Sequence, residues 1–110
     1  MTNPLLTPGF WCECYTSSIT RPARRIAATR VDTPDQAIYW IRTGLEAVIP
    51  ALGGDTHEKA QPWLTEGHIT SAQALTEGTP IDVILLRAGI TIAYTIRPTP
   101  FLTLTNHQPE

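Results

Sequence analysis

Four arginines lie close together in the first third of the chain and could bind anionic groups. They are Arg21, Arg24, Arg25 and Arg30. Guanidinium groups match phosphate and carboxylate oxygens in pairs, so a hairpin that carries them could bind nucleic acid or an acidic protein. In a regular strand Arg24 and Arg30 share one face while Arg25 lies opposite, which weakens the case for a single basic patch. Alternatively, these side chains cover apolar surface and pair with acidic residues elsewhere.

Cys12 and Cys14, together with His57 and His68, form a set of side chains that could bind zinc. Residues two apart on a strand point to the same face, so both sulfurs would lie on one side. The spacing matches no common zinc-finger pattern. We favour the alternative of two small buried thiols and two surface histidines, because free cysteine is among the most buried residue types. The sequence therefore predicts neither a metal nor a cofactor.

The two cysteines also indicate a cellular compartment. Disulfide geometry is narrow, and two cysteines this close on one strand cannot adopt it without distorting the backbone. Reduced thiols are typical of the cytoplasm. The first ten residues lack the basic and apolar regions of a secretory signal. No apolar run approaches the roughly 20 residues that span a bilayer. We expect a cytoplasmic protein without a membrane partner.

A set of carboxylates in the middle of the chain could perform acid–base chemistry with the two histidines. Its members are Asp55, Glu58, Glu66, Glu77 and Asp82. Most of them fit positions near helix N-termini or on the surface, where carboxylates are favourable. Asp82 differs because it lies in an apolar strand, and if buried it would need Arg97 or Arg25 as a partner. The alternative is an exposed Asp82. The chain has no phosphate-binding glycine loop, nucleophile elbow or HExxH motif, so we predict no catalysis.

Five aromatic residues are candidates for either the core or an interface: Trp11, Tyr15, Tyr39, Trp40 and Trp63. Trp11 and Tyr15 share one face of a strand. Tyr39 and Trp40 are adjacent on a helix, so both cannot face the core equally. An exposed aromatic residue among these would be a natural anchor for a partner, although each one taken singly fits the core better.

Length and charge place these residues in a small globular domain. The 110 residues are 42% hydrophobic and 16% charged, and the net charge is −2. That composition supports one packed core and argues against disorder of the whole chain. The charge is uneven, because residues 1–32 carry four basic against two acidic side chains and residues 33–82 carry two against seven. The resulting surface dipole could steer a partner or favour self-association. Alternatively, the charges simply solvate two different elements.

The first half of the chain predicts a hairpin followed by a long helix. Aromatic and apolar residues indicate a strand over residues 10–17, a polar turn follows to residue 22, and a second strand covers residues 23–31. Thr33, Pro34 and Gln36 form a capping box, and apolar residues then recur at helical spacing. A glycine pair ends the run. We predict a helix over residues 34–52, in which Gly44 marks a close packing contact.

The second half predicts short helices and then strands. A short helix fits residues 55–64, and a second capping box at residues 70–73 starts another helix that ends at Gly78. The sequence Leu-Thr-Glu-Gly occurs before both Gly67 and Gly78, which predicts two similar helix ends.

Three strands complete the prediction. Residues 81–87 are nearly all apolar, which is typical of a strand buried on both faces. After a tight turn at Ala88-Gly89, alternation over residues 90–97 predicts a half-buried strand. Pro98 and Pro100 should break this strand, and residues 101–105 should add a last strand at an edge.

These elements predict an α+β fold with the order β-β-α-α-β-β-β. About five antiparallel strands would form a sheet, and one long amphipathic helix would cover one face in a two-layer sandwich. Residues 1–8 should be an irregular arm, residues 9–105 a single domain and residues 106–110 a flexible tail.

The predicted function is that of a small, non-catalytic protein–protein interaction or regulatory module, as a homodimer or with another protein partner. Its predicted binding residues are Trp11, Tyr15, Arg21, Arg24, Arg25 and Arg30. Accessory proteins of phages, plasmids or defence systems often share this size and composition, which is an analogy only. The alternative is a nucleic-acid-associated regulator that uses the arginine-bearing hairpin. A third hypothesis, a small enzyme or ligand-binding fold, lacks convergent polar groups in the sequence.

Overall fold

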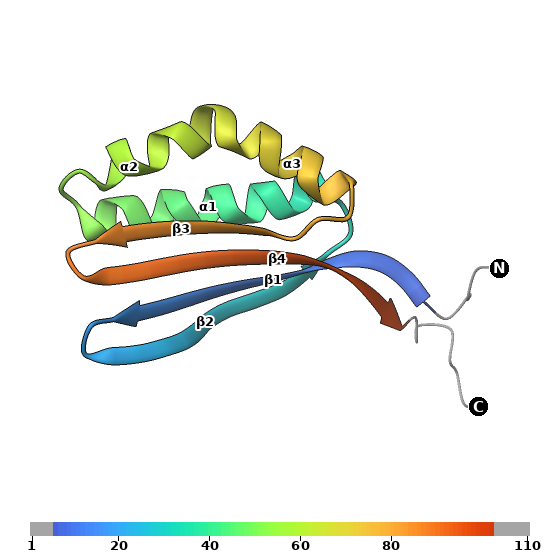
Figure 1. Ribbon diagram of the computed structural model, residues 1–110, viewed down its shortest axis with the longest axis horizontal. Helices are drawn as coiled ribbons and strands as arrows, with labels where there is room; N and C mark the ends of the chain where they lie inside the picture. The colour runs from blue at the N-terminus through green and yellow to red at the C-terminus, as the bar shows by residue number, and fades with distance from the viewer. Residues whose placement is uncertain (1–5, 103–110) are drawn as a thin grey trace.

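The computed structural model describes residues 6–102 as two β-hairpins with a helical layer between them in sequence (Figure 1). The strands are β1 (Leu6–Ser18), β2 (Arg21–Val31), β3 (Ile81–Arg87) and β4 (Ile90–Leu102). The helices are α1 (Pro34–Leu52), α2 (Thr56–Pro62) and α3 (His68–Thr76), and a π-helical segment, η1 (Trp63–Gly67), joins the last two.

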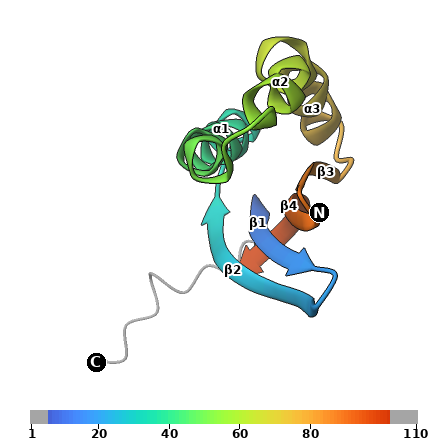
Figure 2. The same cartoon turned by 90° about the vertical axis from the view of Figure 1, so that its left-hand side faces the viewer.

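All four strands form one antiparallel sheet in the order β2-β1-β4-β3. The three helices lie on one side of this sheet, and the opposite side carries no element of the described chain (Figures 1 and 2). The predicted α+β class is therefore confirmed. The sheet has β2 and β3 at its edges, and the two long strands β1 and β4 form its centre.

The core lies between the central strands and the helices, as alternation along the strands requires. Cys12 and Cys14 of β1 face Ile96 and Tyr94 of β4, and all four side chains are buried. The core is completed by Ala37, Ile38, Ile41, Leu45, Ala60, Leu75, Leu85 and Ile92. The residues between the buried ones on β1 therefore point to the uncovered side of the sheet.

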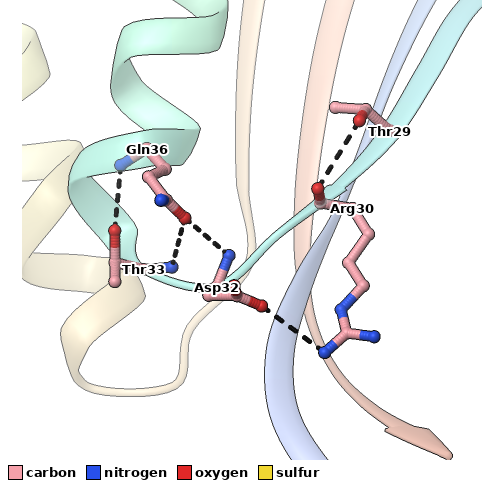
Figure 3. A network of polar contacts seen from close by, with 5 residues as sticks. All are labelled: Thr29, Arg30, Asp32, Thr33 and Gln36. Atoms are coloured by element: carbon pink, nitrogen blue, oxygen red, sulfur yellow. Dashed lines mark hydrogen bonds and ion pairs between the residues drawn. The ribbon is translucent and has the colours of Figure 1, made fainter. Parts of the chain in front are cut away.

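Helix α1 begins and ends where the sequence predicts. Thr33 Oγ1 accepts a hydrogen bond from the Gln36 backbone N–H at 3.1 Å. Gln36 Oε1 in turn accepts from the backbone N–H groups of Thr33, at 3.2 Å, and Asp32, at 2.8 Å (Figure 3). This capping box satisfies donors that the first helical turn leaves free. It also fixes the angle at which the chain leaves β2 and enters α1.

The predicted close contact at Gly44 is present. A Cβ atom at this position would lie 2.8 Å from the ring of Tyr94. The same ring packs edge-on against Trp40, with ring centroids 5.9 Å apart. Helix α1 therefore approaches the sheet closely because residue 44 has no side chain.

The helices after α1 differ from the prediction. Residues 56–76 form one helical run, in which Gly67 has right-handed helical angles, and neither a helix end at Gly67 nor a helix start near residue 70 occurs. The indole of Trp63 lies against Gly67, where a Cβ atom would come within 2.8 Å of it. The Trp63 indole N–H also donates to Ser71 Oγ at 3.0 Å. Gly67 thus makes room for a side chain inside the helix, whereas Gly78, with φ +83°, does follow a helix end as predicted.

The described sheet has four strands instead of about five, because β4 continues through its two prolines to Leu102. Pro98 and Pro100 pair with Phe10 and Pro8 of β1. Strand β3 pairs with β4 only as far as Ile96. In an antiparallel ladder successive residues turn their N–H groups to opposite sides, so the nitrogens of both prolines face the side where β3 has ended. Residues 103–105 of the expected last strand lie outside the described residues.

Two further expectations are corrected by the structure. Strand β3 is an edge strand, with Ile84 and Leu86 exposed, and is not buried on both faces. Residues 6–8 are not irregular, because they already belong to β1 and pair with β4. Residues 1–5 and the predicted tail, 106–110, lie outside the described residues.

Candidate functional site

The uncovered side of the sheet, which we call the open face, carries most of the residues predicted to bind a partner. Side chains from all four strands reach it. They include Trp11, Glu13 and Tyr15 of β1, Arg25 and Arg30 of β2, Thr91, Ala93, Thr95, Arg97 and Phe101 of β4, and Asp82, Ile84 and Leu86 of β3.

A bulge in β2 brings Arg25 to this face. Trp11 pairs with Arg30 and Cys14 pairs with Ala27, but Tyr15 then pairs with Arg25, so the register shifts by one residue between Cys14 and Tyr15. Because of the extra residue, Arg25 lies on the face opposite to the one that regular alternation from Arg30 would give it. The sequence-based expectation that Arg25 lies opposite Arg30 is therefore wrong. Both point to the open face, and Arg24 faces the other way.

Glu13 is the centre of a polar cluster on the open face. Its Oε2 atom accepts hydrogen bonds from the Tyr15 hydroxyl at 3.0 Å and from Arg25 Nη1 at 3.1 Å. The neighbouring Trp11 side chain contributes to the lowered pKa of this carboxylate. Glu13 is only 8% exposed, because these neighbours cover it. These two hydrogen bonds hold Glu13 and Tyr15 of β1 and Arg25 of β2 in fixed positions.

The cluster shifts two ionisation equilibria. Partial burial alone would raise the pKa of Glu13, but hydrogen bonds from Arg25, Tyr15 and Trp11 together lower it below its ordinary value. The same bond to the ionised Glu13 raises the pKa of Tyr15. Glu13 is therefore held as a carboxylate and Tyr15 as a neutral hydroxyl.

Arg97 lies beside this cluster on the central strand β4. It is exposed and is the cross-strand neighbour of the half-buried Trp11. Within residues 6–102 its guanidinium has no carboxylate in ion-pair range, whereas Arg25 is paired with Glu13 and Arg30 with Asp32 at 3.4 Å. Arg97 is thus the arginine of the open face whose charge the described chain leaves unneutralised.

A second aromatic site lies at the end of the open face where β1 and β4 extend beyond the helices. The guanidinium of Arg30 stacks over the ring of Phe101 at 4.4 Å from its centroid. That ring covers Gly9, where a Cβ atom would come within 2.9 Å of it. Arg30 is therefore held by an aromatic ring and by Asp32, whose backbone N–H is in turn fixed by the α1 capping box (Figure 3).

Arg21 and Arg24 are not part of the open face. They lie at the tip of the β1–β2 hairpin, where they line a hollow of about 220 Å³ together with Thr16, Ser17, Ser18, Pro22 and Ile90. Both are exposed, and neither forms an ion pair within the described range. The structure thus brings four of the six predicted residues, Trp11, Tyr15, Arg25 and Arg30, onto one face and leaves two at the hairpin tip.

The zinc hypothesis finds no support in the geometry. Cys12 and Cys14 are free and buried beneath the helices, while His57 is exposed on α2. Residues 6–102 contain no group of three or more metal-ligating side chains. Burial raises the pKa of Cys12 to about 11 and also raises that of Cys14. Both cysteines behave as core residues.

The acidic residues do not converge on one site. Asp82 is exposed on β3, as the alternative expectation had it, and neither Arg25 nor Arg97 pairs with it. Asp55 contacts Arg87 at 3.6 Å and Lys59 at 3.9 Å on the surface near the end of α1. These contacts tie α2 to the β3–β4 hairpin.

The aromatic residues divide as the sequence suggested they must. Trp40 packs on the core, and its neighbour Tyr39 is 70% exposed. Tyr39 lines a groove of about 710 Å³ between α1 and α3, on the side of the molecule away from the sheet.

The polar and aromatic contacts of the open face include three residues that were not among the predicted binding residues. They are Glu13, Arg97 and Phe101. Their contacts arise between neighbouring strands, which the residue pattern of a single strand does not predict. A glutamate inside an aromatic strand was the one visible signal, because a half-buried carboxylate requires a partner. Its partner, Arg25, could not be identified without the bulge.

Comparison with protein-family models, curated proteins and solved structures finds no match to this chain. No helix in the described part of the chain is long and apolar enough to cross a membrane.

Proposed function

We propose that this protein is a small, non-catalytic module that binds another protein through the centre of the open face. The observation that carries this proposal is the pair formed by Trp11 and Arg97, an indole beside an exposed guanidinium without an ion-pair partner in residues 6–102. Tryptophan, tyrosine and arginine dominate the energetics of protein interfaces. The proposed partner presents a carboxylate to Arg97 and an apolar side chain to Trp11 and Tyr15.

The rigidity of this surface supports binding. Hydrogen bonds to Glu13 hold Tyr15 and Arg25 in place before any partner arrives. A surface held in its binding conformation loses less side-chain entropy on association. The face also combines aromatic rings with hydroxyl groups and internally paired charges, which matches the mixed polarity of protein interfaces.

The charges favour a protein over a nucleic acid as the partner of the open face. A phosphate backbone requires several unpaired cations. Here Arg25 and Arg30 already bind Glu13 and Asp32, which leaves Arg97. The Glu13 carboxylate at the centre would also repel phosphate. A protein with a single well-placed carboxylate suits this arrangement better.

The proposed compartment is the cytoplasm. Cys12 and Cys14 are both free thiols, which suits a reducing environment.

The test compares proteins captured from a host lysate by the immobilised full chain and by two charge-reversed variants. Arg97→Glu changes the centre of the open face, and Arg24→Glu places the same change on the opposite face of β2. We expect a protein that the wild-type chain and Arg24→Glu retain equally and that Arg97→Glu loses by at least about tenfold. Calorimetry with that purified protein should reproduce the difference.

The proposal fails if Arg97→Glu captures the same proteins as the wild-type chain. It also fails if nuclease treatment removes the captured material, since the partner would then be a nucleic acid or bound through one. Circular dichroism of both variants checks that they remain folded, which their exposed positions predict.

A nucleic-acid-binding role at the hairpin tip is the second candidate, and one observation favours it. Arg21 and Arg24 line one hollow with the hydroxyls of Ser17 and Ser18, and no carboxylate in the described residues neutralises them. Guanidinium and hydroxyl groups together suit a phosphate.

Fluorescence anisotropy with labelled single-stranded and duplex oligonucleotides tests this second role. Binding should weaken steeply with salt, and Arg21→Ala with Arg24→Ala should reduce the slope of log K against log salt by roughly two phosphate contacts. Arg25→Ala should leave that slope unchanged, because Arg25 is bound to Glu13. No binding at low salt would exclude the role.

A further inference from the structure

Strand β3 has an unpaired side that could receive another strand. The two-residue turn at Ala88-Gly89 has positive φ angles of 52° and 80°, which makes Arg87 and Ile90 a hydrogen-bonded pair. Alternation along an antiparallel ladder then turns the backbone groups of Asp82, Ile84 and Leu86 away from β4. No described strand lies on that side. The Leu86 carbonyl does point outward, because it accepts a hydrogen bond from Lys59 Nζ at 3.0 Å.

The two edges of the sheet are protected to different degrees. Strand β2 contains Pro22 and two register shifts against β1, devices that hinder the addition of another strand. Strand β3 pairs with β4 without a shift over its seven residues and contains neither proline nor glycine. Its outer side is therefore the regular edge of this sheet.

Exposed apolar side chains accompany the outer backbone of β3, of which the Leu86 carbonyl is bound by Lys59. Ile84 is 65% exposed and Leu86 is 56% exposed. Both point to the open face, two residues apart, directly at the edge. A long apolar edge strand of this kind is a template for pairing with another chain.

We propose that two copies of this protein form a homodimer by antiparallel pairing of their β3 strands about a two-fold axis at Ile84. The pairing joins two four-stranded sheets into one continuous sheet of eight strands. It pairs the outward backbone groups of Asp82 and Ile84 in both copies, and at the Leu86 carbonyl it replaces the Lys59 ammonium group by a backbone N–H. An isologous interface of this kind closes on itself, so assembly stops at the dimer.

The sequence of β3 is complementary to itself in this register. Ile84 faces Ile84 of the second copy, which removes two exposed apolar side chains from water together. Asp82 faces Leu86 of the second copy, the residue whose carbonyl Lys59 contacts. In the dimer the Asp82 N–H of the second copy takes the place of the ammonium group at the Leu86 carbonyl, and the same register pair brings the Asp82 carboxylate to the displaced Lys59. A second copy supplies this charge complement twice, by symmetry, which favours it over an unrelated strand.

The dimer does not depend on the protein partner proposed above. Pairing at β3 leaves Trp11 and Arg97, on the central strands, uncovered in both copies. It places two open faces side by side in one larger surface. Variants at β3 and at Arg97 therefore distinguish failure of one proposal from failure of the other.

Sedimentation velocity of the full chain over a range of concentrations tests the dimer. We expect the wild-type chain to show a concentration-dependent monomer–dimer equilibrium. Ile84→Lys places two like charges opposite each other at the axis and should weaken the dimer by at least about tenfold. Ile26→Lys is the matched control, because Ile26 is an isoleucine of similar exposure, 51%, on the other edge strand. It should leave the equilibrium unchanged.

A charge-pair experiment tests the register itself. Ile84→Lys and Ile84→Glu should each be monomeric, and an equimolar mixture should form a heterodimer, because residue 84 faces residue 84 only if the axis passes there. Native mass spectrometry distinguishes the mixed species from either parent. The proposal is overturned if the wild-type chain stays monomeric at millimolar concentration. It is equally overturned if Ile84→Lys dimerises like the wild-type chain or if the mixture forms no heterodimer.

Discussion

Arg25 Nη1 lies 3.1 Å from Glu13 Oε2, and this ion pair crosses the β1–β2 hairpin just beyond the bulge in β2. The glutamate is covered and the arginine is half exposed, with side-chain exposures of 10% and 53%. The ion pair depends on the bulge. Without the extra residue Arg25 would point toward the helical side, and Glu13 would lose its cationic partner.

The first prediction concerns the dependence of stability on pH. Because the pKa of Glu13 is lowered in the folded protein, its ionised form stabilises the fold at every pH above the ordinary glutamate value. That contribution should disappear as the pH falls through the lowered pKa. Urea unfolding between neutral pH and pH values below the ordinary one should show a smaller loss of stability for Glu13→Gln than for the wild-type chain.

A pair of neighbouring arginines provides the control for this prediction. Arg25→Ala removes a partner of Glu13 and should reduce the same pH dependence, whereas Arg24→Ala changes the opposite face of β2 and should not. Equal pH profiles for the two arginine variants would show that the Glu13 cluster does not control acid stability.

The second prediction concerns the reactivity of the buried thiols. The thiolate is the reactive form of cysteine, and burial raises the pKa of Cys12 to about 11 and also raises that of Cys14. Iodoacetamide at pH 8 should therefore modify the folded chain far more slowly than the chain unfolded in guanidinium. Intact-mass measurement over time follows both reactions. Rapid labelling of the folded protein would show that β1 opens or that the two side chains are not buried.

The third prediction concerns the capping box of α1. Thr33→Ala removes the hydrogen bond from the Gln36 N–H and should lower the free energy of unfolding by about 1 kcal/mol. Thr43→Ala is the control, since Thr43 is exposed in the interior of the same helix, where alanine has the higher helix propensity. It should be neutral or slightly stabilising. Urea unfolding measures both, and equal losses would exclude a specific capping effect.

The features that the sequence predicts well are those encoded by neighbouring residues. Helix α1 has a capping box at Thr33 and a glycine at position 53, and both act within a single turn of helix. The turn at Ala88-Gly89 is also local. The alternation of side chains along a strand correctly places Cys12 and Trp11 on opposite faces of the sheet. These signals suffice for the α+β class.

The features that the sequence does not predict depend on segments far apart in the chain. An apolar run such as β3 is typical of a central strand, but strand order makes it an edge. Pro98 and Pro100 predict the end of a strand, yet they are tolerated in β4 because the neighbouring strand has already ended. The position of Arg25 depends on a bulge that the residue pattern of β2 does not predict. The candidate site could therefore be predicted by residue type but not by geometry.

The last prediction concerns the contact between Gly44 and Tyr94, which fixes the distance between α1 and the sheet. Replacing glycine by alanine in an unobstructed helix stabilises a protein by about 1 kcal/mol. Here the new Cβ atom would lie 2.8 Å from the Tyr94 ring, which is buried between Gly44, Trp40 and the thiol of Cys14. Displacing a ring that is 3% exposed and packed edge-on against Trp40 should cost more than the gain in helix propensity, so Gly44→Ala should destabilise the fold by roughly 1–2 kcal/mol.

A double-mutant cycle separates the two effects. Tyr94→Leu should destabilise the protein by itself, because it removes a buried ring. In that background the Cβ atom of alanine meets no ring, so Gly44→Ala should become neutral or stabilising. Urea unfolding of the four proteins gives the coupling energy between the two positions. If Gly44→Ala stabilises the wild-type chain, α1 can shift away from the sheet, and the close approach of helix and sheet at Gly44 is not a constraint of this fold.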